Sequence, residues 1–267
     1  MSTPTASAPP VTLRRGGAVA VLSFNRPEAL NALDIASAQA FAAACREIAA
    51  DSAAGRVRAV VMRGEGKAFG AGGDVAQMRQ GGAAVARELI ENMHEGVRLL
   101  AGIDAPVIAS LHGVVAGGSL SLAACCDLAV AAEGTRFNLA YANIGASCDV
   151  SASWSLPRLV GLRNAMQIAL LSETFDAAEA LRLGLVNRVV PAAELEATVS
   201  ALAQRMAGGP TRAYGHLKRL MRQSLDRDLG AQLDAERDAF LDCTTTADFS
   251  EGIAAFVAKR KPQFGGR

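Results

Sequence analysis

Hydrophobic and polar positions in the first 160 residues alternate between two patterns. Short apolar or β-branched runs are typical of buried strands, and apolar residues spaced three or four positions apart are typical of helices. Because strands that alternate with helices form βαβ units, this order predicts an α/β fold with a mostly parallel sheet. We expect strands within Val11–Phe24 and at Arg56–Met62, Pro106–Leu111 and Asp127–Ala131, and helices after a cap at Asp34, at Ala83–Ala101 and at Gly118–Cys126.

The pattern changes after Gly161, where almost every segment favours a helix. One short strand is expected at Leu185–Val190. The helices are expected at Asn164–Ser172, Ala177–Leu183, Ala192–Ala207, Pro210–Leu225, Leu229–Leu241 and Thr246–Lys261. With no internal repeat and no long linker, we expect a flexible tail over 1–10, a core over 11–200 and a helical C-terminal region over 201–267 in one overall domain. The helical region is expected to extend the first core or to pack against a neighbouring subunit.

Composition and charge limit the kinds of molecule that the protein is expected to bind. The chain has 267 residues, 51% of them hydrophobic, and a formal net charge of +1, which is enough for one large core. A near-neutral charge argues against nucleic-acid or membrane-surface binding, because both need a concentrated basic face. The cysteines show neither metal-ligand spacing nor a disulfide framework, and the first ten residues lack the apolar stretch of a signal peptide. We therefore expect a cytoplasmic protein with no metal site.

Two glycine clusters, Gly70–Gly73 and Gly117-Gly118, each follow an expected strand. Glycine lets the backbone approach a ligand closely, and the first N–H groups of a helix have no intrahelical acceptor. Together the clusters predict two main-chain donors that could stabilise a carbonyl oxygen as it becomes an enolate or a tetrahedral oxyanion. The alternative is a pair of tight turns that only pack strand against helix.

Four motifs in a fixed order cover nearly the whole chain: Asn25–Leu33, Lys67–Asp74, His112–Gly118 and Glu251–Lys261. In this order they resemble the enoyl-CoA hydratase/isomerase (crotonase) superfamily. The resemblance implies a crotonase spiral of ββα units with a helical C-terminal region, assembled as a homotrimer or hexamer. It also implies an acyl-CoA thioester as substrate and no bound cofactor, because coenzyme A is part of the substrate.

The resemblance also assigns binding roles. The N–H groups of Gly73 and Gly118 would hold the thioester oxygen. Phe256 and Lys259 would reach coenzyme A from the C-terminal helix, in many relatives that of a neighbouring subunit, although Lys259 could equally be a solvated helix end. The residues expected to line the strip that binds coenzyme A are Arg26, Ala29, Leu30, Ala71, Asp74, Val75 and Ala76.

The departures from the family pattern concern the acid and base. Hydratases of the family use two glutamates, and Ser121 and Tyr141 occupy the matching positions here. Neither side chain with an ordinary pKa can act as a general base near neutral pH. Asp149 lies where double-bond isomerases of the family carry their catalytic aspartate, and where 4-chlorobenzoyl-CoA dehalogenases carry their nucleophile. Its alternative role is to cap a helix that begins near Val150.

His94 matches the histidine that activates water in the dehalogenases, but a lone histidine on a helix is also a common packing residue. Because Gly73 and Met93 replace aromatic residues of that subfamily, a haloarene would be poorly held. The leading interpretation is therefore an isomerase that shifts a double bond through an enolate, with Asp149 as the base. The alternatives are hydrolytic dehalogenation by Asp149 and His94, hydration with an unusual acid/base set, and a non-catalytic acyl-CoA-binding protein.

Overall fold

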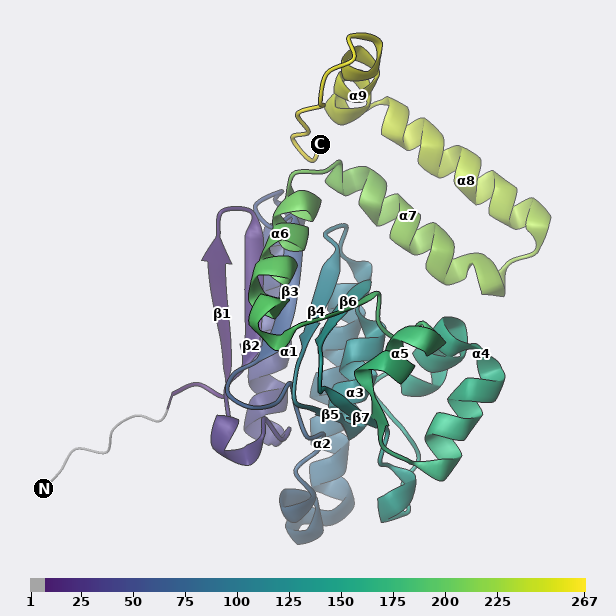
Figure 1. The fold of residues 1–267 in the computed structure, drawn as a ribbon. Helices are drawn as coiled ribbons and strands as arrows, with labels where there is room; N and C mark the ends of the chain where they lie inside the picture. Colours follow the sequence, from purple (N-terminus) through teal and green to yellow (C-terminus); the bar gives the residue numbers. More distant parts are fainter. Residues whose placement is uncertain (1–7) are drawn as a thin grey trace, which may run out of the picture.

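A six-stranded sheet forms the centre of the molecule (Figure 1). The computed structural model describes residues 8–267, so residues 1–7 of the expected tail lie outside the described part. The strands follow the order β1-β2-β3-β4-β6-β9, and all neighbours are parallel except the β1–β2 hairpin. Their bounds are Val11–Gly16 (β1), Val19–Phe24 (β2), Ala59–Gly64 (β3), Val107–Leu111 (β4), Leu128–Ala132 (β6) and Arg188–Val190 (β9).

A second, smaller sheet explains how the chain winds. It contains β5 (Val114–Ala116), β7 (Arg136–Asn138) and β8 (Phe175–Asp176) in the order β5-β7-β8. Single bridges extend it, since Gly70 pairs with Val115 and Leu33 pairs with Gly73. Each turn of the chain therefore passes from a strand of the large sheet through an extended piece beside the small sheet into a helix. The successive turns are β2–Leu33–α1, β3–Gly70–α2, β4–β5–α3 and β6–β7–α4, which together form a spiral.

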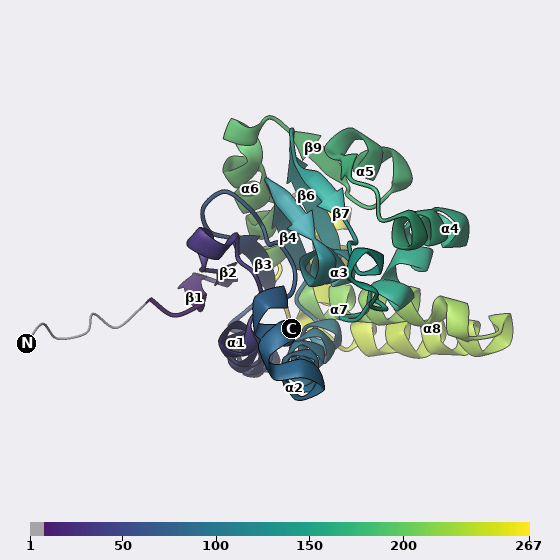
Figure 2. The same ribbon diagram turned by 90° about the horizontal axis from the view of Figure 1, so that it is seen from below.

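Helices cover both faces of the large sheet (Figures 1 and 2). On one face α1 to α4 pack on a core that includes Leu22, Met62 and Leu111. On the other face α6 packs through Leu195 and Val199 against the opposite side of the same strands. The helix bounds are Ile35–Ala53 (α1), Val75–Gly102 (α2), Gly117–Cys125 (α3), Ala152–Leu171 (α4), Ala177–Leu183 (α5) and Leu195–Ala207 (α6).

The start of α2 differs from the sequence prediction. The expected helix at Ala83–Ala101 is its second segment, and the helix already begins at Val75, where the Asp74 carboxylate caps it by accepting from the N–H of Gln77 at 3.1 Å. Gly82 interrupts the helix with φ +57°. A Gly-Gly pair has low helix propensity, and this hid the first segment from pattern reasoning.

Residues 211–267 form an arm that projects from the body (Figure 1). It consists of α7 (Thr211–Gln223), α8 (Leu229–Thr244) and α9 (Ala247–Val257). The predicted helix over Thr246–Lys261 is too long, because α9 ends at Val257 and Lys259 has a left-handed φ of +50°. Within residues 8–267, no helix combines the length and apolar character that a membrane span requires.

Buried charges attach α7 to the body. Lys218 Nζ lies 2.9 Å from one carboxylate oxygen of Asp127, and Arg222 Nη2 lies 2.8 Å from the other. Burial lowers the pKa of the Lys218 ammonium, while the nearby Asp127 carboxylate opposes that shift. Lys218 also donates to the carbonyl oxygens of Ile103 and Ala105. One carboxylate thus organises the junction between arm and body.

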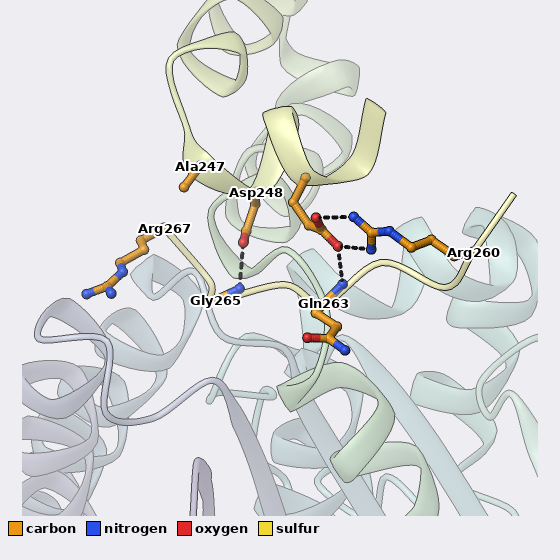
Figure 3. Close-up of a pocket in the computed structure, with 7 residues that line it drawn as sticks. Ala247, Asp248, Arg260, Gln263, Gly265 and Arg267 are labelled. Atoms are coloured by element: carbon orange, nitrogen blue, oxygen red, sulfur yellow. Dashed lines mark hydrogen bonds and ion pairs between the residues drawn. The ribbon is translucent and has the colours of Figure 1, made fainter. Parts of the chain in front are cut away.

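The last residues of the chain fold back onto α9 around an open pocket of about 530 Å³ (Figure 3). The Asp248 carboxylate accepts from the N–H of Gly265 at 2.6 Å. The Glu251 carboxylate accepts from the N–H of Gln263 at 2.7 Å and from Arg260 at 2.6 and 2.7 Å. The hydrogen bonds from Arg260 hold the pKa of Glu251 at about 2. These contacts, which we call the C-terminal clasp, hold the last residues of the chain against α9.

Candidate active site

Two glycine loops from neighbouring turns of the spiral lie in contact. Gly73 directly precedes the Asp74 cap of α2, and Gly118 is the second residue of α3. A Cβ atom added to Gly72 would lie 3.0 Å from the Ala116 oxygen and 3.3 Å from the Gly118 nitrogen. Gly72 also has φ +91°, which side chains rarely tolerate. This position therefore requires glycine both for its backbone conformation and for the close approach of the two loops.

The two expected donors are not engaged within the protein. In the described part of the chain, the Gly73 N–H donates no hydrogen bond to another residue. The Gly118 N–H lies in the first turn of α3, where no intrahelical acceptor exists. The pair can therefore donate to a ligand oxygen. The neighbouring N–H groups are satisfied: Ala71 by Leu30 O, Gly72 by Ser119 Oγ and Asp74 by Leu33 O.

A row of hydrogen-bonded side chains lies beside the donor loops. Ser121 of α3 is fully buried, and its Oγ lies 3.3 Å from the hydroxyl of Tyr141, which follows β7. Tyr141 in turn donates to the carboxylate of Asp149, which precedes α4. A Cβ added to Gly118 would lie 3.6 Å from the Tyr141 hydroxyl. The row therefore passes beside Gly118 at Tyr141 and ends at a carboxylate.

Proton positions in this row follow from the environment of Tyr141. Burial raises the pKa of the Tyr141 hydroxyl above its ordinary value, and the negative charge of Asp149 raises it further. Tyr141 consequently stays protonated and acts as a donor. Since a serine hydroxyl is also a poor base, Asp149 is the member of the row that can accept a proton from a bound molecule.

The helix-cap interpretation of Asp149 is wrong. The N-cap of α4 is Ser151, and the helix begins at Ala152. The Asp149 carboxylate instead accepts from Tyr141, and only its main-chain oxygen receives the N–H of Ala152, at 3.1 Å.

His94 lies close to Asp149 in the fold, but its Nε2 already accepts a hydrogen bond from the protein. Its Nε2 accepts the N–H of Val150 at 3.1 Å. A ring nitrogen that accepts a hydrogen bond carries no proton and has used its lone pair, so Nε2 is not free to activate a water molecule. The adjacent Met93 is fully buried in the core.

The residues expected to bind coenzyme A from the N-terminal half lie together. The N–H of Ala71 donates to the oxygen of Leu30, which joins the two segments. Arg26 is not a free cation, because it pairs with Asp34 at 3.1 Å and with Asp74 at 3.6 Å. Its observed role is to hold the two segments together. The exposed members of this strip are Leu30, Val75 and Ala76, whereas Ala29 and Ala71 are half-buried.

Phe256 and Lys259 do not join that strip within one chain. Figure 1 places α9 at the opposite end of the molecule from the start of α2. Phe256 is 85% exposed, and Lys259 is exposed just beyond the helix.

Sequence reasoning missed two residues of the site. Ser119 fixes the Gly72 loop by accepting its N–H at 3.2 Å. The methyl group of Met78 fills the space into which a side chain at Gly73 would project. Met78 went unnoticed because the helix was expected to begin only at Ala83, which left its side chain in an expected loop. Nothing in the sequence pattern linked Ser119 to a loop 47 residues away.

A spiral of ββα units in which successive turns bring two unpaired main-chain donors together is the crotonase fold, and the predicted fold is confirmed. The chain belongs to the enoyl-CoA hydratase/isomerase family, whose model matches residues 14–267. An enoyl-CoA hydratase structure from Polaromonas sp. JS666 superposes with a TM-score of 0.88 at 32% identity, covering 95% of this chain and 98% of that one.

Curated relatives include proteins named as hydratases and a protein named as an isomerase. The crotonyl-CoA hydratase of Syntrophomonas wolfei is 34% identical over 255 residues, 95% of this chain and 97% of that protein. The 1,2-epoxyphenylacetyl-CoA isomerase of Escherichia coli is 33% identical over 253 residues, 93% of this chain and 95% of that protein. Within residues 8–267, no cluster of histidine, cysteine or acidic side chains has the arrangement of a metal site.

Proposed function

We propose that this protein binds an acyl-CoA thioester and shifts a carbon–carbon double bond in its acyl chain, with Asp149 as the base. The observation that carries the proposal is the row Ser121–Tyr141–Asp149, which passes Gly118 at the Tyr141 hydroxyl and ends in one carboxylate. One carboxylate suffices to take a proton from one carbon and return it to another.

The proposed reaction balances without a co-reactant. The thioester oxygen of a β,γ-unsaturated acyl-CoA accepts the N–H groups of Gly73 and Gly118. The Asp149 carboxylate removes a proton from the α carbon, and the C–H electron pair moves toward that oxygen to form an enolate. The γ carbon then takes the proton back from Asp149, which leaves an α,β double bond. Donors aimed at a developing oxyanion contribute about 100- to 1000-fold each in rate.

Hydration is the second candidate, favoured by names among the relatives such as crotonyl-CoA hydratase. Adding water needs a base to deprotonate the water and an acid to protonate the α carbon. Here the two glutamate positions hold Ser121 and a Tyr141 whose pKa is raised. Asp149 would have to perform both roles, and for this reason we place hydration second.

Hydrolytic dehalogenation has less support. It would require His94 to activate water, yet the Nε2 of that residue accepts the Val150 N–H. Gly73 and Met93 also provide no aromatic face for a ring.

The proposal includes a second copy of the chain. The C-terminal arm exposes large apolar side chains, among them Met221 (73%), Leu225 (71%), Leu229 (74%) and Phe256 (85%). A homotrimer or hexamer would cover such a surface. It would also bring Phe256 and Lys259 of one subunit to the coenzyme A strip of its neighbour.

Product mass and the variant Asp149→Asn test the proposal. A panel of β,γ-unsaturated acyl-CoA thioesters of graded chain length should give products of unchanged mass with a shifted double bond, whereas hydration adds one water molecule. Loss of the general base should lower kcat by about 100- to 10,000-fold. Asp234→Asn, at an exposed position on α8, is the matched control and should retain full activity.

Three results would count against this assignment. Full turnover by Asp149→Asn would exclude Asp149 as the base. A hydrated product would favour the second candidate. Tight binding of acyl-CoA with no turnover of any thioester would indicate a non-catalytic binding protein.

A further inference from the structure

The residues directly after Asp149 adopt an unusual backbone conformation. Val150 has φ +50° and Ser151 has φ +73°, so two consecutive non-glycine residues are left-handed. Such angles are rare for any side chain and most unfavourable for a β-branched one. They persist only where the surrounding structure imposes them, and they cluster at functional sites. We therefore expect contacts from another part of the protein to maintain the left-handed turn that follows Asp149.

One side chain from another element holds this turn. The Val150 N–H donates to His94 Nε2 at 3.1 Å, across 56 residues of sequence. The Val150 side chain is 1% exposed, so its N–H has little access to water as an alternative partner. Within residues 8–267, the Ser151 side chain bonds only inside its own segment, to Ser155 at 3.0 Å.

His94 is well placed for this task. It lies in the second segment of α2, between the buried side chains of Leu89 and Leu100, and directly follows the fully buried Met93. A ring anchored on a packed helix has little freedom to move. Because Nε2 accepts, the proton of the neutral ring lies on Nδ1.

We propose that His94 is a positioning residue. By accepting the Val150 N–H, it holds the left-handed turn that presents the Asp149 carboxylate to Tyr141 and to the bound thioester. The proposal rests on the function proposed above for Asp149, and it replaces direct participation of His94 in the chemistry. If the turn relaxes to ordinary angles, the chain direction at Asp149 changes and the carboxylate leaves its place beside Tyr141.

Two variants separate this role from a purely structural one. His94→Ala removes the acceptor, whereas His94→Gln restores an amide oxygen at a reach similar to that of Nε2. A misplacement of about 1 Å can lower a rate by about 100-fold, so we expect kcat of His94→Ala to fall by about this factor while KM stays near the wild-type value. His94→Gln should recover most of the lost kcat. Asn92→Ala, on the same helix, is the matched control.

A second readout does not depend on turnover. The chain contains only two tyrosines, so 3-fluorotyrosine labelling gives two ¹⁹F resonances, which Tyr141→Phe assigns. The resonance of residue 141 should move in His94→Ala, because the hydrogen bond to Asp149 is lost, and should stay in place in His94→Gln and Asn92→Ala.

Each outcome decides the proposal. An unchanged kcat or an unmoved ¹⁹F resonance in His94→Ala would overturn it. Equal loss of activity in His94→Ala and His94→Gln, with equal loss of thermal stability, would reduce His94 to a packing residue and also overturn it. If the wild-type enzyme isomerises no thioester, the proposed function fails, and the ¹⁹F shift alone then decides whether His94 positions Asp149.

Discussion

Gly72 shows how one residue determines the geometry of the donor pair without donating to the ligand itself. Its φ of +91° and the 3.0 Å approach of the Ala116 oxygen both oppose a methyl group at this position. At Gly118, by contrast, an added Cβ would make ordinary contacts of 3.5 Å with Leu33 and 3.6 Å with Tyr141. The two glycines therefore serve different purposes.

This difference predicts different stabilities. Gly72→Ala should lower the free energy of unfolding by about 1–3 kcal/mol, because it combines a left-handed backbone with a close contact. Gly118→Ala, the matched control, should lose clearly less. Urea unfolding followed by Trp154 fluorescence measures both. Equal stability of the two variants would contradict our account of the loop contact.

At this scale the sequence identified single residues but not their contacts. Gly73 and Gly118 were predicted because each belongs to a motif, and Asp149 was predicted because it matches the position of a catalytic aspartate in relatives. The bond between Tyr141 and Asp149 could not be read from the sequence, since it depends on how the irregular segment after β7 folds. The same holds for His94 and Val150, whose contact spans two elements.

At the scale of elements, Asp127 is the more buried of the two carboxylates in the described body that pair with α7, the other being Asp104. Asp127 receives Lys218 and Arg222, and its Oδ2 also accepts the N–H of Val107 at 2.8 Å. Lys218 is only 8% exposed. Neutralising Asp127 would leave a buried ammonium without its counter-charge.

Asp127→Asn should therefore lower the free energy of unfolding by about 3–5 kcal/mol, the usual cost of breaking a buried ion pair from one side. Asp104→Asn is the control, because Asp104 also pairs with α7, through Arg219, but in a more exposed setting. Its loss should not exceed about 1 kcal/mol. Denaturant unfolding of both variants checks the contrast, and similar losses would contradict it.

The C-terminal clasp should respond to acid. The pKa of Glu251 is about 2 in the folded protein, against an ordinary value of 4.5. Between these values the folded state binds fewer protons than the unfolded state. The stabilisation is therefore complete above about pH 4.5 and is lost as the pH falls toward 2.

Carboxyl ¹³C resonances followed by NMR during an acid titration measure this shift directly. Arg260→Gln should return the pKa of Glu251 toward 4.5, because the Arg260 hydrogen bonds are the largest cause of the shift. Arg182→Gln, which removes a comparable exposed pair with Glu179, should leave Glu251 unaffected. An unchanged Glu251 titration in Arg260→Gln would refute the attribution.

Most large elements were predictable from hydrophobic spacing, because long amphipathic segments give a strong signal. Asp34 caps α1 through the N–H of Ser37 at 2.7 Å as expected. The strands β5 and β7 were missed because three residues carry too little periodicity to detect. The end of α9 was misplaced because Lys259-Arg260-Lys261 resembles a favourable helix terminus, whereas Arg260 turns back to Glu251.

At the scale of the whole molecule, the projecting arm predicts that assembly and coenzyme A binding are linked. Leu229 is 74% exposed at the first position of α8. A glutamate there suits the helix dipole, so Leu229→Glu should leave α8 intact while charging the proposed contact. We expect a smaller assembly in analytical ultracentrifugation and a raised KM for acyl-CoA. Glu236→Gln, also exposed on α8, should change neither quantity, and an unchanged assembly in Leu229→Glu would exclude this face from the contact.

The oligomer remains a prediction from the family resemblance and the exposed apolar residues. Composition indicated one large core. The structure has a large core on one face of the main sheet and a second, smaller core on the other face. The sequence pattern of one chain does not identify the surface on a second subunit that packs against the arm, because that surface belongs to another molecule.

The expected donors Gly73 and Gly118 are main-chain groups on adjacent turns of the spiral. Their loops are held by the close approach of Gly72 to Ala116 and Gly118 and by the Ser119 hydroxyl, and none of these residues belongs to the row Ser121–Tyr141–Asp149. Substitutions at Ser121, Tyr141 and Asp149 can therefore change the acid–base groups without moving the loops that carry Gly73 and Gly118. New thioester reactions on this backbone can therefore be sought by varying three positions rather than by redesigning the protein.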